Sequence, residues 1–295
     1  MATTSTILVL GATGQQGGAV VDALESGEFG TFDTVAGTRN PASDAAEALR
    51  ERGVRVVPVD MLDRESLVAA MDGVDAVFAV TTFFESGIDA ERAQGEHVVA
   101  ACESAGIDHL VFSSVGSADA DTGLDHFESK AHTERLIAEA GIDATILRPV
   151  YFMQNLAMQA DEIRSGTVSL ALSEGTKLAM VDARDIGRAA AAAFADPETY
   201  VGETLTLAGD SLTVEELAAV LTEYLDTDVE AVHLDTEALR AAAGDEMADM
   251  FVWFDETGYD VDIPALEQTL GFELRDFETC LAETEFIARS ETPAQ

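Results

Sequence analysis

A short apolar run near the N-terminus leads directly into a cluster of glycines, and this feature restricts the fold more than any other. Residues 6–10 read as a buried strand, and Gly11-Ala12-Thr13-Gly14-Gln15-Gln16-Gly17-Gly18 opens an amphipathic helix expected over residues 15–26. A glycine turn can serve chain reversal alone. A strand before it and a helix after it instead indicate the first βαβ unit of a parallel sheet.

The same alternation of strand and helix continues through the first half of the chain. Strands are expected at residues 34–38, 54–59, 76–81, 109–113 and 144–147, with helices near residues 43–52, 63–71, 88–105 and 126–140. Because parallel strands are joined by helical crossovers, this pattern predicts an α/β fold. It should be a doubly wound parallel Rossmann sheet with helices on both faces.

The domain organisation follows from the point where this rhythm weakens. Residues 1–150 are predicted to form the Rossmann domain, together with residues 178–200, which contain a strand at 178–181 and an Ala-rich helix at 183–195. Residues 151–177 plus 201–290 are predicted to form a smaller C-terminal α/β domain for a substrate or partner. Thr213 and Glu216 form a capping box for its helix at 213–224. The cleft between the domains is the expected ligand site.

The glycine turn predicts a dinucleotide site. Gly11 permits a tight turn, Gly14 lets the backbone approach a pyrophosphate, and Gly17 lets the helix pack close to the strand. The pyrophosphate would lie at the N-terminal end of the helix, where free backbone N–H groups bind anions. Thr13, Gln15 and Gln16 complete the predicted loop.

The end of the second strand indicates which dinucleotide is bound. An NAD site places a carboxylate on the ribose about 20 residues after the glycine turn, but residues 34–40 contain none. Arg39 stands there instead and can pair with a 2′-phosphate, so NADP(H) is preferred over NAD(H). A surface arginine is the alternative. Thr38 is included in this site, and Asp60 and Met61 could flank the adenine, although Asp60 could equally cap a helix.

The charge of the chain predicts its environment. Acidic residues outnumber basic ones by 56 to 16, giving a net charge of −40 spread along the sequence, while 47% of residues are apolar. At molar salt the Debye length falls to about 3 Å and screens such repulsion, so a halophilic protein of a high-salt cytoplasm is expected. Lys130 and Lys177 are the only lysines.

Several classes of function find no support. An acidic surface repels nucleic acid, and the sequence shows neither a signal peptide nor the roughly 18 apolar residues of a membrane span, so a soluble cytoplasmic protein is expected. Neither Cys102, Cys280 nor the histidines show metal-ligand spacing, so no metal site is predicted. Monomer and homodimer both remain open.

Further motifs accompany the glycine turn: Thr38-Arg39-Asn40-Pro41, Val80-Thr81-Thr82 with Glu85-Ser86, Gln94-Gly95, His126-Phe127 with Lys130, Arg148-Pro149, Tyr151-Phe152 and Asn155-Leu156. As a set, over nearly the whole chain, they resemble the NmrA-like group of atypical short-chain dehydrogenase/reductases, in particular its HSCARG-type members. The resemblance implies an NADP-preferring Rossmann domain with a small C-terminal domain. It leaves activity open, because such proteins include quinone reductases, redox-sensing regulators and enzymes without a known substrate.

The chain departs from the wider group at one position. Typical short-chain dehydrogenases place a proton-donating tyrosine four residues before a lysine, whereas here His126 precedes Lys130. The spacing puts both on one face of a helix expected to begin with a capping box of Asp125 and Glu128. His126 is a candidate general acid, although the nearby ammonium disfavours a protonated imidazole. A surface or ribose-side histidine is the alternative.

The resemblance also suggests roles for neighbouring residues. Lys130 has the stronger case for a cofactor or catalytic role, because lysine is rare in this chain. Ser113 matches a serine that holds the substrate carbonyl, or it simply ends a strand. Thr81 and Thr82 should lie near the nicotinamide half. Pro149 and Tyr151 are also included in the expected site, with core packing as the alternative for Tyr151.

Two functions of different classes follow. The first is an NADPH-dependent reductase of a quinone or carbonyl, favoured by Thr81, Ser113 and Lys130. The second is a non-catalytic sensor whose binding to a regulatory protein partner depends on NADP(H), favoured by the missing tyrosine.

Overall fold

The computed structural model describes residues 4–287, and its contacts divide the chain into two compact units. The first unit consists of Met1–Pro149 and Ala183–Thr206, and the second of Val150–Asp182 and Leu207–Gln295. No helix within the described residues is long and apolar enough to cross a bilayer.

One large sheet forms the centre of the first unit, with the strand order β10-β6-β5-β4-β1-β2-β3. Its strands are β1 (Thr6–Leu10), β2 (Asp33–Thr38), β3 (Arg55–Pro58), β4 (Ala76–Val80), β5 (His109–Ser113), β6 (Ala144–Pro149) and β10 (Thr204–Leu207). All neighbours from β3 to β6 pair in parallel. The sheet grows from β1 in one direction and from β4 in the other, which is the Rossmann order. The predicted fold class is confirmed.

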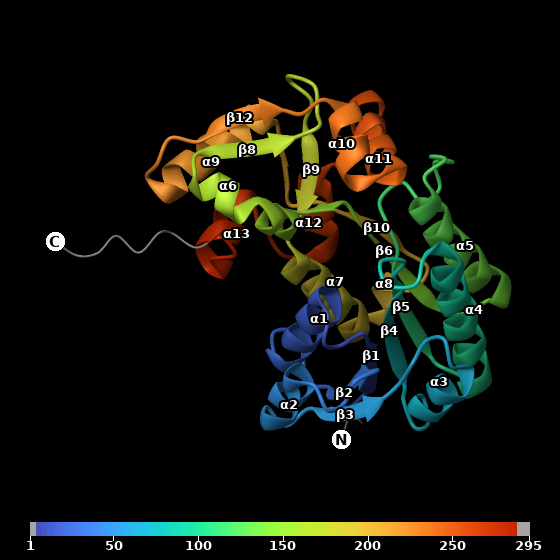
Figure 1. Ribbon diagram of the computed structural model, residues 1–295. Helices are drawn as coiled ribbons and strands as arrows, with labels where there is room; N and C mark the ends of the chain where they lie inside the picture. The colour runs from blue at the N-terminus through green and yellow to red at the C-terminus, as the bar shows by residue number, and fades with distance from the viewer. Residues whose placement is uncertain (1–3, 288–295) are drawn as a thin grey trace. The chain divides into compact units, whose positions relative to one another are not determined.

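Helices cover both faces of this sheet. They are α1 (Gln15–Glu25), α2 (Asp44–Glu51), α3 (Arg64–Ala70), α4 (Ile88–Ala105), α5 (Asp125–Ala140), α7 (Ala183–Ala195) and α8 (Pro197–Tyr200). Figure 1 shows α1, α2 and α7 on one side of the sheet and α3, α4 and α5 on the other. A buried apolar core joins Val77 and Leu110 of the strands to Leu67 of α3 and Val98 of α4. The doubly wound arrangement therefore buries the apolar strands on both faces.

Close packing against α7 fixes α1 on its face of the sheet. A Cβ atom on Gly187 of α7 would lie 2.2 Å from the carbonyl oxygen of Ala19 in α1. Only glycine tolerates so close an approach of two helix backbones. The helix that follows the glycine turn is thereby held firmly in place.

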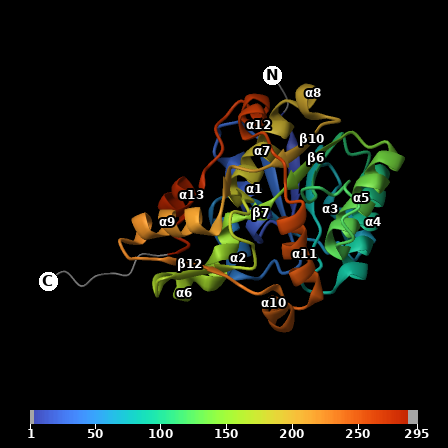
Figure 2. The same ribbon diagram turned by 90° about the horizontal axis from the view of Figure 1, so that it is seen from above.

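The second unit contains a three-stranded sheet, β11-β9-β7, and a two-stranded sheet, β12-β8. Its elements are β7 (Tyr151–Phe152), η1 (Met153–Gln159, a 3-10 helix), α6 (Ala160–Arg164), β8 (Thr167–Leu170), β9 (Leu178–Val181), β11 (Asp210–Leu212), α9 (Val214–Leu225), β12 (Glu230–His233), α10 (Thr236–Ala243), α11 (Asp245–Glu256), α12 (Ile263–Leu270) and α13 (Phe277–Thr284). Helices α9 and α13 lie side by side (Figure 2). Thr213 and Glu216 cap α9 reciprocally, as predicted.

Three local predictions are wrong. Residues 178–181 are predicted for the Rossmann domain, but β9 pairs with β7 and β11 in the second unit. The position beside β6 is taken by β10, from the segment predicted for the smaller domain. An apolar run indicates a buried strand without specifying which sheet it joins. Helix α5 also lacks its predicted capping box, because Leu124 holds the N-cap position and no side chain caps it.

Candidate dinucleotide site

The loops after four strands bring most of the predicted site residues to one edge of the large sheet. β1 lies between β2 and β4, and β5 lies beside β4. The glycine turn follows β1, Thr38 ends β2, Thr81 follows β4, and Ser113 ends β5. The direction in which strands are added reverses between β1 and β4. Ligands of doubly wound folds bind at this point.

The backbone of the glycine turn explains two of its glycines. Gly11 has a φ of 69°, in the left-handed region that favours glycine, and its carbonyl oxygen accepts a hydrogen bond of 2.9 Å from the N–H of Gly14. A Cβ atom on Gly17 would lie only 2.2 Å from that same oxygen. The first turn of α1 therefore packs directly against the end of β1, as predicted for Gly11 and Gly17.

The N-terminal end of α1 is suited to an anion. Gly14 is the N-cap residue, no side chain in the described chain caps the helix, and its first turn contains no acidic residue. Thr13 and Gln15 beside it are exposed. In a chain this acidic, an end with free N–H donors, the positive end of the helix dipole and no carboxylate fits a pyrophosphate.

Arg39 is held at the end of β2 by a carboxylate from another loop. Its Nη2 donates to Oε1 of Glu85 at 2.8 Å, and its Nη1 donates to Oε2 of the same residue. Both side chains are about half exposed, at 55% and 54%. The hydrogen bond from Arg39 holds the pKa of Glu85 below its usual value. Thr38, which precedes Arg39, is buried and lies with its Oγ1 3.3 Å from Oγ1 of Thr13.

Asp60 and Met61 follow β3 and are partly buried. The carboxylate of Asp60 accepts from the N–H of Leu62 at 2.9 Å, so it stabilises a turn. The cap of α3 is Asp63, whose carboxylate accepts from two backbone N–H groups. The carbonyl oxygen of Met61 lies 3.0 Å from Nδ1 of His97. The alternative in which Asp60 caps the helix is therefore wrong.

Lys130 lies in a buried polar cluster. Its Nζ donates to the carbonyl oxygen and Oγ1 of Thr81, at 2.6 and 2.9 Å, and lies 3.1 Å from Oε1 of Glu91. Glu91 is fully buried and also accepts from Oγ of Ser129. Burial lowers the pKa of Lys130, and the charge of Glu91 opposes this shift. A compact ammonium with three donors suits these three acceptor atoms, whereas a guanidinium is planar and presents its donors in a fixed fork.

Glu91 was not identified from the sequence, although it is the only fully buried glutamate in the core of the described residues. It lies one turn before Gln94, whose Oε1 accepts from the N–H of Thr82 at 3.0 Å. Oγ1 of Thr81 donates to Oε1 of Glu91 at 3.3 Å, so helix α4 supports both threonines after β4. The signal in the sequence was weak, because one buried glutamate cannot be distinguished among so many exposed acids.

Ser113 is fully buried and its hydroxyl donates to Oε1 of Gln16 at 2.6 Å. This bond joins the end of β5 to the first turn of α1. The geometry gives Ser113 a positioning role for Gln16 and the glycine turn. Its neighbour Ser114 donates instead to Glu134, which also binds Arg148 through two hydrogen bonds.

His126 lies among aromatic rings. Its ring centroid is 5.3 Å from that of Phe83 and 4.7 Å from that of Phe127. Phe83 stacks on Phe84 at 4.2 Å, and Phe84 is 78% exposed. His126 and Lys130 both contact the segment after β4, as their spacing on one helix face predicts. Phe83 and Phe84 form an aromatic surface on the segment after β4, which Lys130 also contacts.

The last two predicted residues occupy different units. Pro149 ends β6 and is buried, and its carbonyl oxygen accepts from the N–H of Gly116. Tyr151 belongs to the second unit, where it packs edge-on against Phe251 and Phe254. Burial raises the pKa of Tyr151 to about 12. Core packing, the alternative for Tyr151, is therefore what its contacts support.

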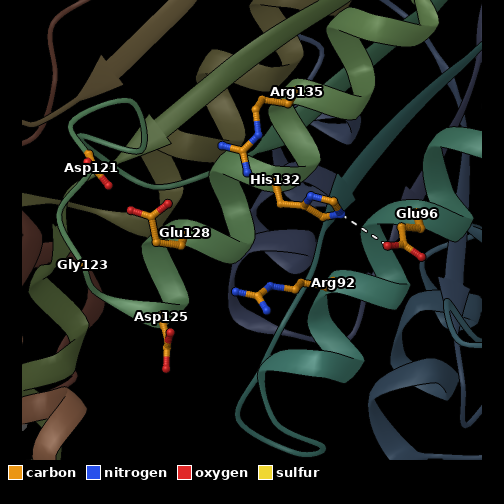
Figure 3. A pocket seen from close by; sticks show the side chains of 8 residues that line it. All are labelled: Arg92, Glu96, Asp121, Gly123, Asp125, Glu128, His132 and Arg135. Atoms are coloured by element: carbon orange, nitrogen blue, oxygen red, sulfur yellow. Dashed lines mark hydrogen bonds and ion pairs between the residues drawn. The ribbon is translucent and has the colours of Figure 1, made fainter.

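A further pocket of about 550 Å³ opens elsewhere on the first unit, along α4 and α5. Figure 3 shows Arg92, His132 and Arg135 around it, with His132 directed at Glu96 at 3.3 Å. None of the predicted site residues lines it. No group of three or more potential metal ligands was found among residues 4–287.

Comparison with known proteins gives a consistent family assignment. Residues 3–284 match the NmrA-like family. The chain is 31% identical to an NAD(P)H azoreductase of Xenophilus azovorans, over 80% of this chain and 79% of the relative. It is 30% identical to quinone oxidoreductase 2 of Escherichia coli K12, over 80% of each chain.

Solved structures agree with this fold. The Escherichia coli NADPH-dependent quinone oxidoreductase in complex with NADPH has a TM-score of 0.80 and 27% identity, covering 94% of this chain and 98% of that chain. The negative transcriptional regulator NmrA in complex with NADP has a TM-score of 0.78 and 18% identity, covering 96% of each chain. At this low identity, the similarity of this chain to the regulator shows only that the two share a fold.

Proposed function

Because this chain belongs to the NmrA-like family, we propose that it binds NADP(H) at the glycine turn and reduces a quinone or carbonyl substrate. The observation that carries the proposal is the pairing of an open helix end at α1 with Arg39 at the end of β2. The first suits a pyrophosphate, and the second suits a 2′-phosphate.

Different residues of the first unit would bind different parts of the dinucleotide. Backbone N–H groups at Gln15 and Gln16 would hold the pyrophosphate, and Arg39 would select NADP(H) over NAD(H). Thr81 and Thr82, supported by α4, would lie beside the nicotinamide half. Ser113 would act indirectly by holding Gln16.

The chemistry rests on the buried lysine and the aromatic surface. The reduced cofactor, when bound, supplies a hydride. Lys130 would orient the ribose and place positive charge near the reacting atoms, an effect that is strongest where water is excluded. Phe83 and Phe84 offer a flat apolar contact for a ring-shaped acceptor such as a quinone. Quinone reduction needs no tyrosine, since water or His126 can deliver the proton.

The relatives support this choice of acceptor. Two enzymes that this chain resembles over four-fifths of its length are a quinone oxidoreductase and an azoreductase by name. Both names describe reduction of flat, conjugated acceptors.

A second function, a non-catalytic NADP(H)-responsive regulator, is favoured by one observation. The tyrosine that donates a proton in typical short-chain dehydrogenases is replaced by His126, whose ring is packed against Phe83 and Phe127. A sensor needs cofactor binding and no proton donor.

NADPH oxidation separates the two functions. The purified protein should oxidise NADPH at 340 nm when a panel of quinones and aldehydes is offered in molar KCl. Binding of NADPH without oxidation by any acceptor would favour the sensor. Capture of partners from a lysate with and without NADPH then tests that reading, since capture that ignores the cofactor would contradict it.

A further inference from the structure

Arg39 and Glu85 connect the loops on either side of the glycine turn. Arg39 directly follows β2, Glu85 lies five residues beyond the end of β4, and β1 lies between these strands in the sheet. Their hydrogen bonds join residues 46 positions apart in the sequence. The pair therefore forms at the point where the predicted dinucleotide site is expected.

The geometry of the pair is that of phosphate recognition. Both terminal nitrogens of Arg39 donate to the two carboxylate oxygens of Glu85, a fork-to-fork arrangement. A phosphate uses the same two nitrogens in the same way. One guanidinium edge cannot bind a carboxylate and a phosphate at the same time.

We infer that Glu85 is a specificity-determining residue, which competes with the 2′-phosphate of NADP(H) for the guanidinium of Arg39. This inference rests on the proposed function, because it requires Arg39 to recognise that phosphate. NADPH must displace Glu85, whereas NADH, with a hydroxyl at the same ribose position, leaves the pair intact. Glu85 thereby weakens the binding of NADPH but not that of NADH, and so reduces the ratio of the two affinities.

Charge explains why the phosphate can win this competition. A phosphate monoester carries more negative charge than a carboxylate at neutral pH and offers three acceptor oxygens. The carboxylate of Glu85 is half exposed, so its pairing with Arg39 is screened and weak. Displacement therefore reduces NADPH affinity without preventing binding. It also frees the segment after β4, which carries the exposed ring of Phe84.

The test compares Glu85→Gln with Asp89→Asn. Asp89, an exposed acid in the first turn of α4, makes no hydrogen bond to Arg39, so its variant controls for the loss of one nearby charge. Dissociation constants for NADPH and NADH are measured at the lowest KCl concentration that keeps the protein folded. Glu85→Gln should tighten NADPH about two- to fivefold, the range typical of one exposed ion pair, and leave NADH unchanged. Asp89→Asn should change the dissociation constant for NADPH less than Glu85→Gln does.

The Arg39→Ala variant distinguishes competition by Glu85 from the role of Arg39 itself. In an Arg39→Ala background, Glu85→Gln should affect NADPH binding no more than Asp89→Asn does. If Arg39→Ala weakens NADPH but Glu85→Gln tightens it no more than Asp89→Asn, the competition is absent and the inference is wrong. If Arg39→Ala leaves NADPH binding unchanged, the assignment of Arg39 in the proposed function is wrong, and the inference falls with it.

Discussion

The Nζ atom of Lys130 lies 3.1 Å from a carboxylate oxygen of Glu91, whose side chain is fully buried in the first unit. The two residues are opposite charges removed from water, and each compensates the other. Breaking such a pair by removing one member is costly, whereas removing both members can be nearly neutral. This asymmetry makes the pair testable without reference to any substrate.

Lys130→Met should lower the free energy of unfolding by about 3 kcal/mol or more, because it leaves Glu91 buried without its cation. Adding Glu91→Gln should restore most of that loss. Lys177→Met is the matched control, since Lys177 is the only other lysine and is 56% exposed. Chemical denaturation in molar KCl measures all four proteins. A double variant no more stable than Lys130→Met would show that the two charges do not compensate each other.

The double variant also isolates the functional role of Lys130. Under the proposed function it should bind NADPH more weakly and show a lower kcat at saturating NADPH. An interaction that strengthens in the transition state appears in kcat as well as in binding. Weaker binding with an unchanged kcat would restrict Lys130 to holding the cofactor.

His126→Ala should lower kcat for a quinone acceptor less than about tenfold, because water can supply the proton. Loss of a true general acid costs about 10²–10⁴-fold. His132→Ala is the control, from the same helix and beside Glu96. Initial rates with NADPH and one quinone are sufficient. A loss of 10²-fold or more for His126→Ala alone would make His126 the proton donor.

His109 should make the fold sensitive to mild acid. Its ring is buried, its Nε2 lies 2.8 Å from Oγ1 of Thr145, and burial lowers its pKa from 6.5 to about 4. Between pH 6.5 and 4, His109 is protonated in the unfolded chain but neutral in the folded protein. The free energy of unfolding therefore falls as the pH falls through this range.

The size of this effect can be isolated with His109→Gln. Between pH 6.5 and 5 the wild type should lose about 2 kcal/mol more than the variant, at constant high salt. The measurement is the free energy of unfolding at each pH. Equal losses in the two proteins would mean that His109 titrates normally in the fold.

The large sheet could be predicted from the sequence because each of its βα units has a local signature. Alternating apolar runs and helices indicated β1 to β6 within a residue or two of their observed bounds. The assignment of residues 178–181 failed because pairing with β7 and β11 depends on contacts far along the chain. The close packing at the glycine turn could be predicted because it is local, since Gly11 and Gly17 are only a few residues apart in the sequence.

Residues of the candidate site could be predicted only where their chemistry is local. Arg39 was identified because it stands at the end of the second strand, where an NAD site would have a carboxylate, and Lys130 because lysine is rare in this chain. Their partners Glu85 and Glu91 could not be identified, because nothing in the sequence distinguishes these two from the other acidic residues among the 56. Each also lies about 40 residues or more from its cation along the chain. The bond from Ser113 to Gln16 spans 97 positions and likewise had no sequence signal.

Salt should stabilise this protein strongly. With a net charge of −40, repulsion between surface carboxylates opposes the compact state until ions screen it. The midpoint of thermal unfolding should therefore rise steadily between dilute buffer and molar KCl, with loss of structure in dilute buffer and recovery when salt is restored. A midpoint that is indifferent to salt would contradict the expectation of a halophilic protein.

The affinity of wild type and Arg39→Asp for NADPH and NADH tests the central claim most directly. The substitution removes a cationic partner of the 2′-phosphate and adds repulsion, and a charged hydrogen bond is worth about 1.5–3 kcal/mol. NADPH binding should therefore weaken about tenfold or more, while NADH binding stays the same or improves. Titration calorimetry of both cofactors with both proteins gives the four dissociation constants. Equal affinity of the two proteins for NADPH would contradict the account.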